Sequence, residues 1–113
     1  MVKSYKAGSI VVIELRNSII GIPESIKIKK KFAQHIEEGD LHFVVDISKV
    51  DIMNSSGLGI LISSLTTIKK NNGTLKIAGA NNQIQHILKV TKLNAIFELI
   101  DTLENALKFS SES

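Results

Sequence analysis

Apolar residues form short runs in some parts of the chain and recur every three or four residues in others, so the pattern predicts alternating strands and helices. Strands are expected over residues 2–5, 10–15, 41–47, 74–80 and 95–100. Helices are expected over residues 24–38, 57–70 and 82–90, and again after residue 101. Asp101 and Glu104 resemble a capping box for that last helix. Ala7-Gly8 between the first two strands predicts an opening hairpin.

The order of these elements predicts an α/β fold. Two strands followed by alternating helices and strands favour a mixed, mostly parallel β-sheet of about four to five strands with about four α-helices and right-handed crossovers. The 113 residues, 43% of them hydrophobic, suffice for one packed core, so residues 1–113 are expected to form a single domain. Its ordered core is expected over about 2–109, because the polar end at 110–113 should fray.

Composition narrows the class of protein further. A formal net charge of +3 does not indicate a nucleic-acid binder, so no direct DNA binding is expected. The absence of cysteine excludes disulfides, a thiolate nucleophile and a cysteine-based zinc site. The apolar run near the start is too short for a signal peptide or a membrane span, so we expect a cytoplasmic protein without membrane insertion.

A polar segment, Asn54-Ser55-Ser56, stands directly before the periodicity of the predicted helix 57–70. Ser55 has two interpretations at this stage. It can be a structural N-cap, or it can be a hydroxyl whose phosphate would meet the positive end of the helix dipole. Gly57 and Gly59 likewise either allow a partner or a phosphate to approach closely, or serve tight packing of the helix start.

The segment DISKVDIMNSSGLGIL resembles STAS domains, particularly the bacterial anti-sigma factor antagonists, with their strand, serine pair and GLG. The resemblance implies a STAS-like fold and a protein that is not an enzyme. It implies that a serine kinase, which is also the anti-sigma factor, phosphorylates Ser55, with Ser56 as the secondary candidate. The unmodified protein would bind the anti-sigma factor and free sigma factor. Phosphorylation would weaken that complex, and a phosphatase would restore it.

The same resemblance implies a partner-binding surface. It would consist of the serine segment with the residues that follow it, and of the loop after the second strand: Asn54, Ser55, Ser56, Gly57, Leu58, Gly59, Asn17 and Ser18. Two departures are visible, since Asn54 stands where the family usually has aspartate and the loop at 16–21 lacks the usual glycine–aspartate pattern. An alternative function is therefore an interaction or scaffold subunit of a stressosome-like complex or a lipid-transport ABC system, without a phospho-switch.

Other kinds of site have weaker support. Gly57-Leu58-Gly59 opens a helix as in dinucleotide sites, but Ile62 occupies the position of the third glycine, so no cofactor is expected. Asp46 and Asp51 could hold Mg²⁺ or act in acid–base chemistry, although turn formation explains them more simply. The remaining candidates are polar side chains expected at the surface or its boundary, with no metal site and no stacking aromatics: His35, His42, His86, Lys27, Lys29, Lys30 and Lys31.

Overall fold

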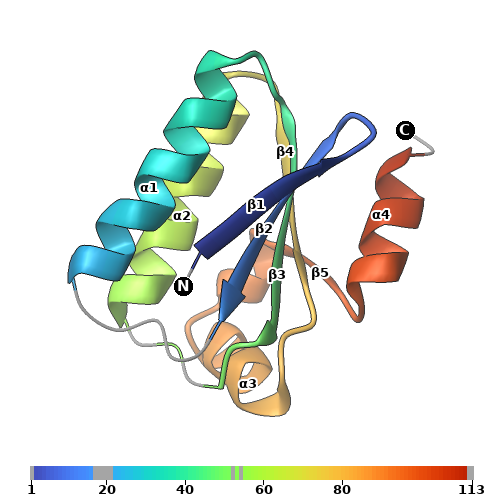
Figure 1. Ribbon diagram of the computed structural model, residues 1–113. Coiled ribbons are helices and arrows are strands. Elements are labelled where there is room, and N and C mark those ends of the chain that lie inside the picture. Colours follow the sequence, from blue (N-terminus) through green and yellow to red (C-terminus); the bar gives the residue numbers. More distant parts are fainter. Residues whose placement is uncertain (1, 17–21, 52, 54, 112–113) are drawn as a thin grey trace.

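The computed structural model describes residues 2–16, 22–51, 53 and 55–111, and these form one five-stranded sheet in the order β1-β2-β3-β4-β5 (Figure 1). β1 runs antiparallel to β2, and every later pair of neighbours is parallel. The strands are β1 (Val2–Ala7), β2 (Ile10–Arg16), β3 (His42–Lys49), β4 (Thr74–Ala78) and β5 (Glu98–Ile100).

Helices cover both faces of this sheet. Residues of three helices pack into the core on one face, and those of a fourth pack on the other face. Figure 1 shows this arrangement. The first three are α1 (Ile22–Glu37), α2 (Ser55–Lys70) and α3 (Asn82–Val90), and the fourth is α4 (Leu103–Ser111). A short 3-10 helix, η1 (Leu93–Ala95), connects α3 to β5. The predicted α/β class, with a mixed and mostly parallel sheet and four helices, is confirmed.

The two faces of the sheet have cores of different size, because successive side chains of a strand point to opposite faces. Val11 and Ile13 of β2 belong to the large core beneath α1, α2 and α3. Phe32 of α1 packs on Phe43 of β3 in that core, with ring centroids 5.4 Å apart. On the opposite face a smaller cluster packs against Ala106 of α4. The large core therefore fixes the three helices whose first turns border the candidate site.

Several predicted boundaries agree with the structure. The opening hairpin turns at Gly8, whose φ of +65° is a conformation that glycine adopts readily. Gly39, with φ +92°, ends α1, and its N–H donates to the carbonyl of Ile36 while Asp40 N–H donates to that of His35. The bounds predicted for the third helix, 82–90, are those of α3.

The last two predicted elements differ in detail. The predicted strand 95–100 is wrong at its start, because Lys92 takes φ +62° and the N–H groups of Ile96 and Phe97 both donate to Leu93 within the η1 turn. β5 consequently begins at Glu98. The predicted capping box of Asp101 and Glu104 is also wrong, since the hydroxyl of Thr102 accepts the N–H of Asn105, the bond expected of an N-cap.

The helix starts lie at one edge of the sheet. β2, β3 and β4 end at this edge, and the first residues of α1, α2 and α3 follow them (Figure 1). In α/β sheets the carboxyl edge of parallel strands is the usual position of a functional site. α2 begins at Ser55, two residues before the predicted start, so the candidate serine belongs to the helix itself.

Within the described residues, none of the helices combines the length and the apolar character needed to cross a bilayer.

Candidate partner-binding site

The candidate site is built around the first turn of α2. The first N–H groups of a helix have no partner within it, and the aligned peptide dipoles make this end positive. Ser55 and Ser56 supply the first two backbone positions of α2, and no acidic residue lies in this first turn. The arrangement can therefore accept a negative group at the helix start without like-charge repulsion from α2 itself.

The other residues predicted for this surface lie in different environments. Gly57 is buried, and Leu58 is buried within the large core, where it anchors the first turn of α2 to the sheet. Gly59 is exposed. Asn17, Ser18 and Asn54 lie outside the described residues, so their predicted place in the partner surface stays a prediction.

Gly59 does not serve tight packing. A Cβ added at this position would meet no atom within 4 Å, so alanine would fit without any clash. Glycine inside a helix costs roughly 0.5–1 kcal/mol relative to alanine. The packing interpretation of Gly59 is therefore wrong for this protein.

Asn81 holds the segment that leads to Ser55. Its side-chain amide donates to the carbonyl oxygens of Val50 at 3.1 Å and Asp51 at 3.0 Å. Its side-chain oxygen accepts the N–H of Ile84 at 2.8 Å and so caps α3. One side chain thus fixes the start of α3 to the loop after β3. Sequence reasoning missed this residue, although an asparagine directly before a predicted helix is a typical N-cap signal.

Charged side chains gather where β2 and β3 end. Arg16 of β2 is in register with Lys49 of β3, and both contact Glu14, through Arg16 Nε at 2.9 Å and Lys49 Nζ at 3.4 Å from the same carboxylate oxygen. Burial acts to raise the pKa of Glu14, but the hydrogen bonds and positive charges of Arg16 and Lys49 together outweigh it, so the pKa lies below its ordinary value. A fixed ion cluster therefore borders the two strand ends that precede the predicted partner loops.

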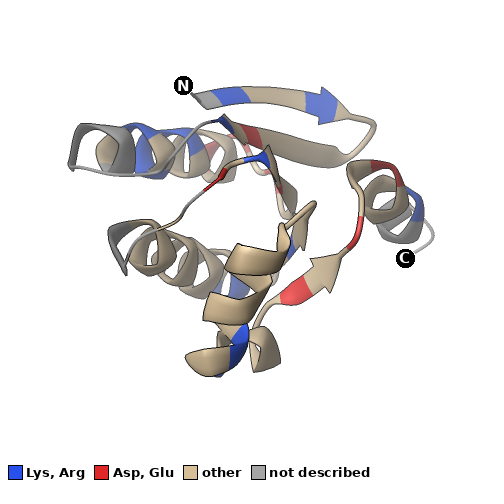
Figure 2. Ribbon diagram, turned by 90° about the horizontal axis from the view of Figure 1, so that it is seen from below, with Lys and Arg blue, Asp and Glu red and all other residues tan. Residues whose placement is uncertain are grey.

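Charge is unevenly distributed along the chain around this site. No Asp or Glu occurs between Asp51 and Glu98, a stretch that contains all of α2 and α3 and five lysines. Figure 2 shows the molecule from the edge where the helices begin, with basic and acidic residues coloured. The surface of α2 and α3 is therefore basic to neutral, which favours a partner surface or a modifying group that carries negative charge.

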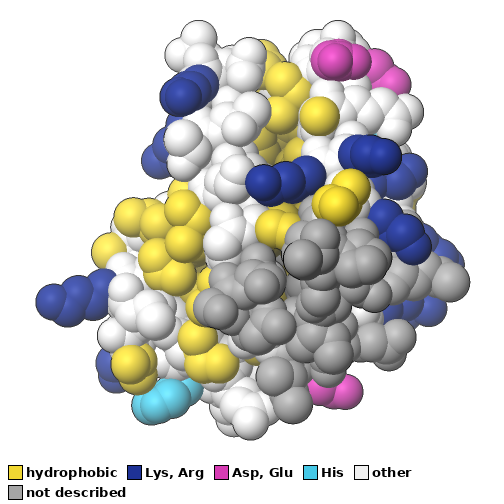
Figure 3. All heavy atoms as spheres, turned by 90° about the vertical axis from the view of Figure 1, so that its left-hand side faces the viewer, with side chains coloured by type: hydrophobic (Ala, Val, Ile, Leu, Met, Phe, Trp, Pro, Cys, Tyr) yellow, Lys and Arg dark blue, Asp and Glu magenta, His cyan; other side chains and the backbone are white. Residues whose placement is uncertain are grey.

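A groove separates α1 from α2 on the face shown in Figure 3. Its volume is about 170 Å³, and its walls combine apolar atoms of Phe32 and Ile36 with the hydroxyl residues Ser63 and Thr67 and with Lys29. The groove is mixed in character and open to solvent. It continues the exposed surface of α2 beyond Gly59, but it contains no set of side chains arranged for a chemical reaction.

Asp46 and Asp51 do not form a cation site in the structure. Asp46 is buried, and one of its oxygens accepts the N–H of Ser48 at 3.0 Å, which is the turn-forming role. Asp51 is exposed. Among the residues that the structure describes, the group able to offer three ligand atoms to a metal is a different one, His35 with Glu38 and Asp40.

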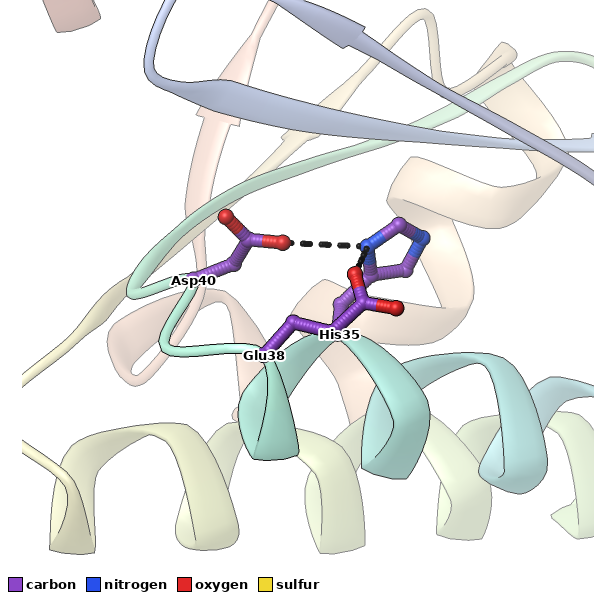
Figure 4. Close-up of side chains that lie close together, drawn as sticks. All are labelled: His35, Glu38 and Asp40. Atoms are coloured by element: carbon purple, nitrogen blue, oxygen red, sulfur yellow. Dashed lines mark hydrogen bonds and ion pairs between the residues drawn. The ribbon is translucent and has the colours of Figure 1, made fainter.

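The expectation for His35 is wrong. Only 9% of this residue is exposed, and its ring lies beside Glu38 and Asp40 at the end of α1 (Figure 4). The signal was present in the sequence, since His35 and Glu38 are three residues apart on a predicted helix and therefore share a face.

Comparison with known proteins identifies the family. The model of the STAS domain matches residues 2–106 of the chain. The chain belongs to the STAS domain family. This match covers the whole sheet, the serine segment and the first part of α4, and it confirms the resemblance inferred from the segment around Ser55.

A relative in Thermotoga maritima has a name that assigns it provisionally to the anti-sigma factor antagonists. It is 26% identical to this chain over 105 residues, which are 92% of this chain and 93% of the relative. An anti-sigma F factor antagonist of Paenibacillus polymyxa is 27% identical over 66 residues, 58% of this chain and 56% of that protein. Sequence similarity thus connects this STAS domain to proteins named as anti-sigma factor antagonists.

Solved structures share the fold. The phosphorylated form of the Bacillus cell fate determinant SpoIIAA superposes with a TM-score of 0.78 at 16% identity, covering 97% of this chain and 99% of that one. An anti-sigma factor antagonist from Mycobacterium paratuberculosis gives a TM-score of 0.83 at 19% identity, covering 96% and 91% of the two chains. At identities this low, the structural similarity shows that these proteins share the fold.

Proposed function

We propose that this STAS protein is a non-enzymatic, cytoplasmic anti-sigma factor antagonist whose binding is controlled by phosphorylation of Ser55. In this proposal the unphosphorylated protein binds an anti-sigma factor that is also a serine kinase, and so frees sigma factor. Phosphorylation weakens the complex, and a phosphatase reverses it. The names of the sequence relatives support the class of partner.

One observation carries the proposal. Ser55 is the first residue of α2, at the edge of the sheet where the parallel strands end. A hydroxyl at this position precedes backbone N–H groups that have no acceptor within the helix itself, and it is close to the positive end of the helix dipole. An acceptor serine is therefore combined with an environment that stabilises the phosphorylated product.

Charge explains how phosphorylation could change binding while leaving the domain folded. A phosphate adds a charge of about −1.5 to −2 at neutral pH. At the first turn of α2, which has no acidic residue, this charge is favourable within the protein. A partner that packs against Ser55 would instead have to desolvate the phosphate, which costs binding free energy.

The test is a phosphorylation assay with the genome's candidate anti-sigma factor kinase and ATP. We compare the wild-type protein with Ser55→Ala and Ser56→Ala, and we map the modified peptide by mass spectrometry. The proposal predicts a single phosphate on Ser55 in the wild type and in Ser56→Ala, and none in Ser55→Ala. Modification at Ser56, or the absence of modification by a kinase that binds the protein, would overturn the assigned acceptor.

The alternative, a scaffold subunit of a stressosome-like or lipid-transport complex, makes a different prediction in the same experiment. Such a subunit would bind its partners through the same fold without depending on Ser55. Ser55→Glu would then assemble as the wild type does, and neither protein would bind an anti-sigma factor.

A further inference from the structure

A second feature lies at the other end of α1, away from the serine segment. His35 occupies the last turn of α1, Glu38 follows the helix, and Asp40 lies two residues before the start of β3. Figure 4 shows the three side chains converging from one short stretch of chain. One ligand atom of each lies within 4.8 Å of those of the other two.

The separations between these atoms suit a metal ion. Nδ1 of His35 is 3.1 Å from Oδ2 of Asp40 and 3.8 Å from Oε2 of Glu38. Zinc binds imidazole nitrogen and carboxylate oxygen at about 2.0–2.2 Å, so two ligands of a tetrahedral ion are about 3.3 Å apart. The two observed separations lie on either side of this value. Small rotations of the exposed Glu38 side chain can complete the geometry.

Two neighbours from β1 hold the ligands in position. Nε2 of His35 lies 3.2 Å from the hydroxyl oxygen of Ser4, and Nζ of Lys6 lies 2.8 Å from Oδ1 of Asp40. When the ring donates its Nε2–H to Ser4, Nδ1 presents a lone pair to two carboxylates. A cation between the three groups relieves the repulsion between this lone pair and the carboxylate oxygens. Lys6 uses the other oxygen of Asp40, so Oδ2 stays available to a metal.

Burial adds to this arrangement. The side chain of His35 is 11% exposed and that of Asp40 is 9% exposed, while Glu38 at 53% opens the cluster to solvent. The ring of His35 also packs edge-on against Phe43, with centroids 6.4 Å apart. Two ligands are thus fixed before any ion binds, and the third provides the entry path.

We propose that His35, Glu38 and Asp40 form a binding site for a divalent transition metal, with Zn²⁺ as the best-suited ion. One nitrogen and two oxygen ligands suit Zn²⁺ and related ions, because Ca²⁺ and Mg²⁺ prefer oxygen ligands alone. Water completes the coordination. The bound ion joins the end of α1 to the start of β3, and through Ser4 and Lys6 it also stabilises the position of β1.

The test measures Zn²⁺ binding and thermal stability in the full chain without an affinity tag. Glu38→Gln replaces one carboxylate ligand with a neutral amide. Because the position is exposed, this variant should fold. Glu37→Gln is the matched control, because Glu37 is the exposed neighbouring acid outside the cluster and loses the same charge. Calorimetric titration with Zn²⁺, thermal unfolding with and without Zn²⁺, and Co²⁺ absorption spectra are recorded for all three proteins.

We expect one Zn²⁺ per chain in the wild type and in Glu37→Gln, with a saturable rise in Tm that a chelator reverses. Glu38→Gln should bind at least about tenfold more weakly, which is the scale of loss seen for disturbed metal sites. Absence of saturable binding in the wild type would overturn the proposal and leave the cluster as a hydrogen-bond network. Equal binding by all three proteins would also overturn it, because the ion would then bind elsewhere. Neither outcome depends on whether Ser55 is phosphorylated.

Discussion

Among the single residues of the candidate site, Gly59 leads to the clearest prediction. It lies about one helical turn after Ser55 on α2, it is exposed, and a Cβ there would meet open space. The proposed function explains this glycine as a point where a partner approaches the helix backbone. The same residue would otherwise be a small and uncompensated cost to the stability of α2.

Gly59→Ala should therefore separate stability from binding. We expect the free energy of unfolding to rise by roughly 0.5–1 kcal/mol, measured by urea denaturation, because alanine favours the helix. Affinity for the partner should fall, because the added methyl group occupies the space that the partner needs. A variant that gains stability and binds as well as the wild type would contradict the role given to Gly59.

Gly79→Ala is the contrasting control. Gly79 has φ +78°, and a Cβ there would lie 2.7 Å from Cβ of Ser48. This variant should lose stability, since both the backbone conformation and the contact are unfavourable for alanine. The pair therefore tests whether the denaturation assay responds to the local environment of each glycine.

Asn81 gives a second prediction at this scale. Asn81→Ala removes two hydrogen bonds to the loop after β3 and the N-cap of α3, so we expect a loss of about 1–2 kcal/mol in urea denaturation. The rate of phosphorylation of Ser55 should also change, because the segment before it loses its anchor. Asn82→Ala, at the exposed next position, should change stability by less than about 0.5 kcal/mol. Equal effects of the two substitutions would contradict the anchoring role.

At the scale of elements, the hydrophobic pattern predicts most of the fold because the strands are short apolar runs and the helices have regular four-residue spacing. It fails where hydrogen bonds rather than burial decide the structure. The segment 95–100 is apolar except for Glu98, yet the left-handed Lys92 and the bonds to Leu93 form a turn of η1 before β5. A turn of this kind leaves no trace in the apolar pattern.

The candidate site was predictable to a similar degree. Ser55 and Gly59 follow from the motif, because a helix start has a recognisable sequence signal. The bonds from Asn81 to Val50 and Asp51, and the convergence of Ser4 on His35, connect residues far apart in the chain. Such contacts depend on how α3 and β1 pack, which one sequence does not reveal. The sequence-based prediction that no metal is bound could not take these long-range contacts into account.

The ends of β2 and β3 give a prediction on pH. Glu14 is ionised and paired with Arg16 and Lys49 in the folded protein, and its pKa lies below its ordinary value. Its contribution to stability is therefore present above the pKa of the unfolded chain, near 4.5 for a glutamate, and is lost as the pH falls through the lower pKa of the folded state. The effect should be small, because Lys49 is 56% exposed.

Glu14→Gln provides the measurement. We expect the wild type to be more stable than this variant at neutral pH in urea denaturation, with the difference shrinking as the pH is lowered below about 4.5. A difference in stability that stays constant from neutral to acidic pH would show that the charge of Glu14 does not stabilise the two strand ends.

At the scale of the whole molecule, we propose separate roles for the two ends of the sheet. The carboxyl edge carries the start of α2 with Ser55, the anchor Asn81 and the acid-free surface of α2 and α3. The opposite end carries the cluster at the close of α1, which secures β1. Binding can therefore be regulated at one end while the other end maintains the fold.

The most direct test of the central claim is the affinity of the anti-sigma factor for this protein before and after phosphorylation of Ser55, measured by isothermal titration calorimetry at one salt concentration. Ser55→Ala, treated with kinase in the same way, is the control. We expect at least a tenfold weaker complex for the phosphorylated protein and no change for Ser55→Ala. Equal affinity of the phosphorylated and unphosphorylated forms would contradict the claim.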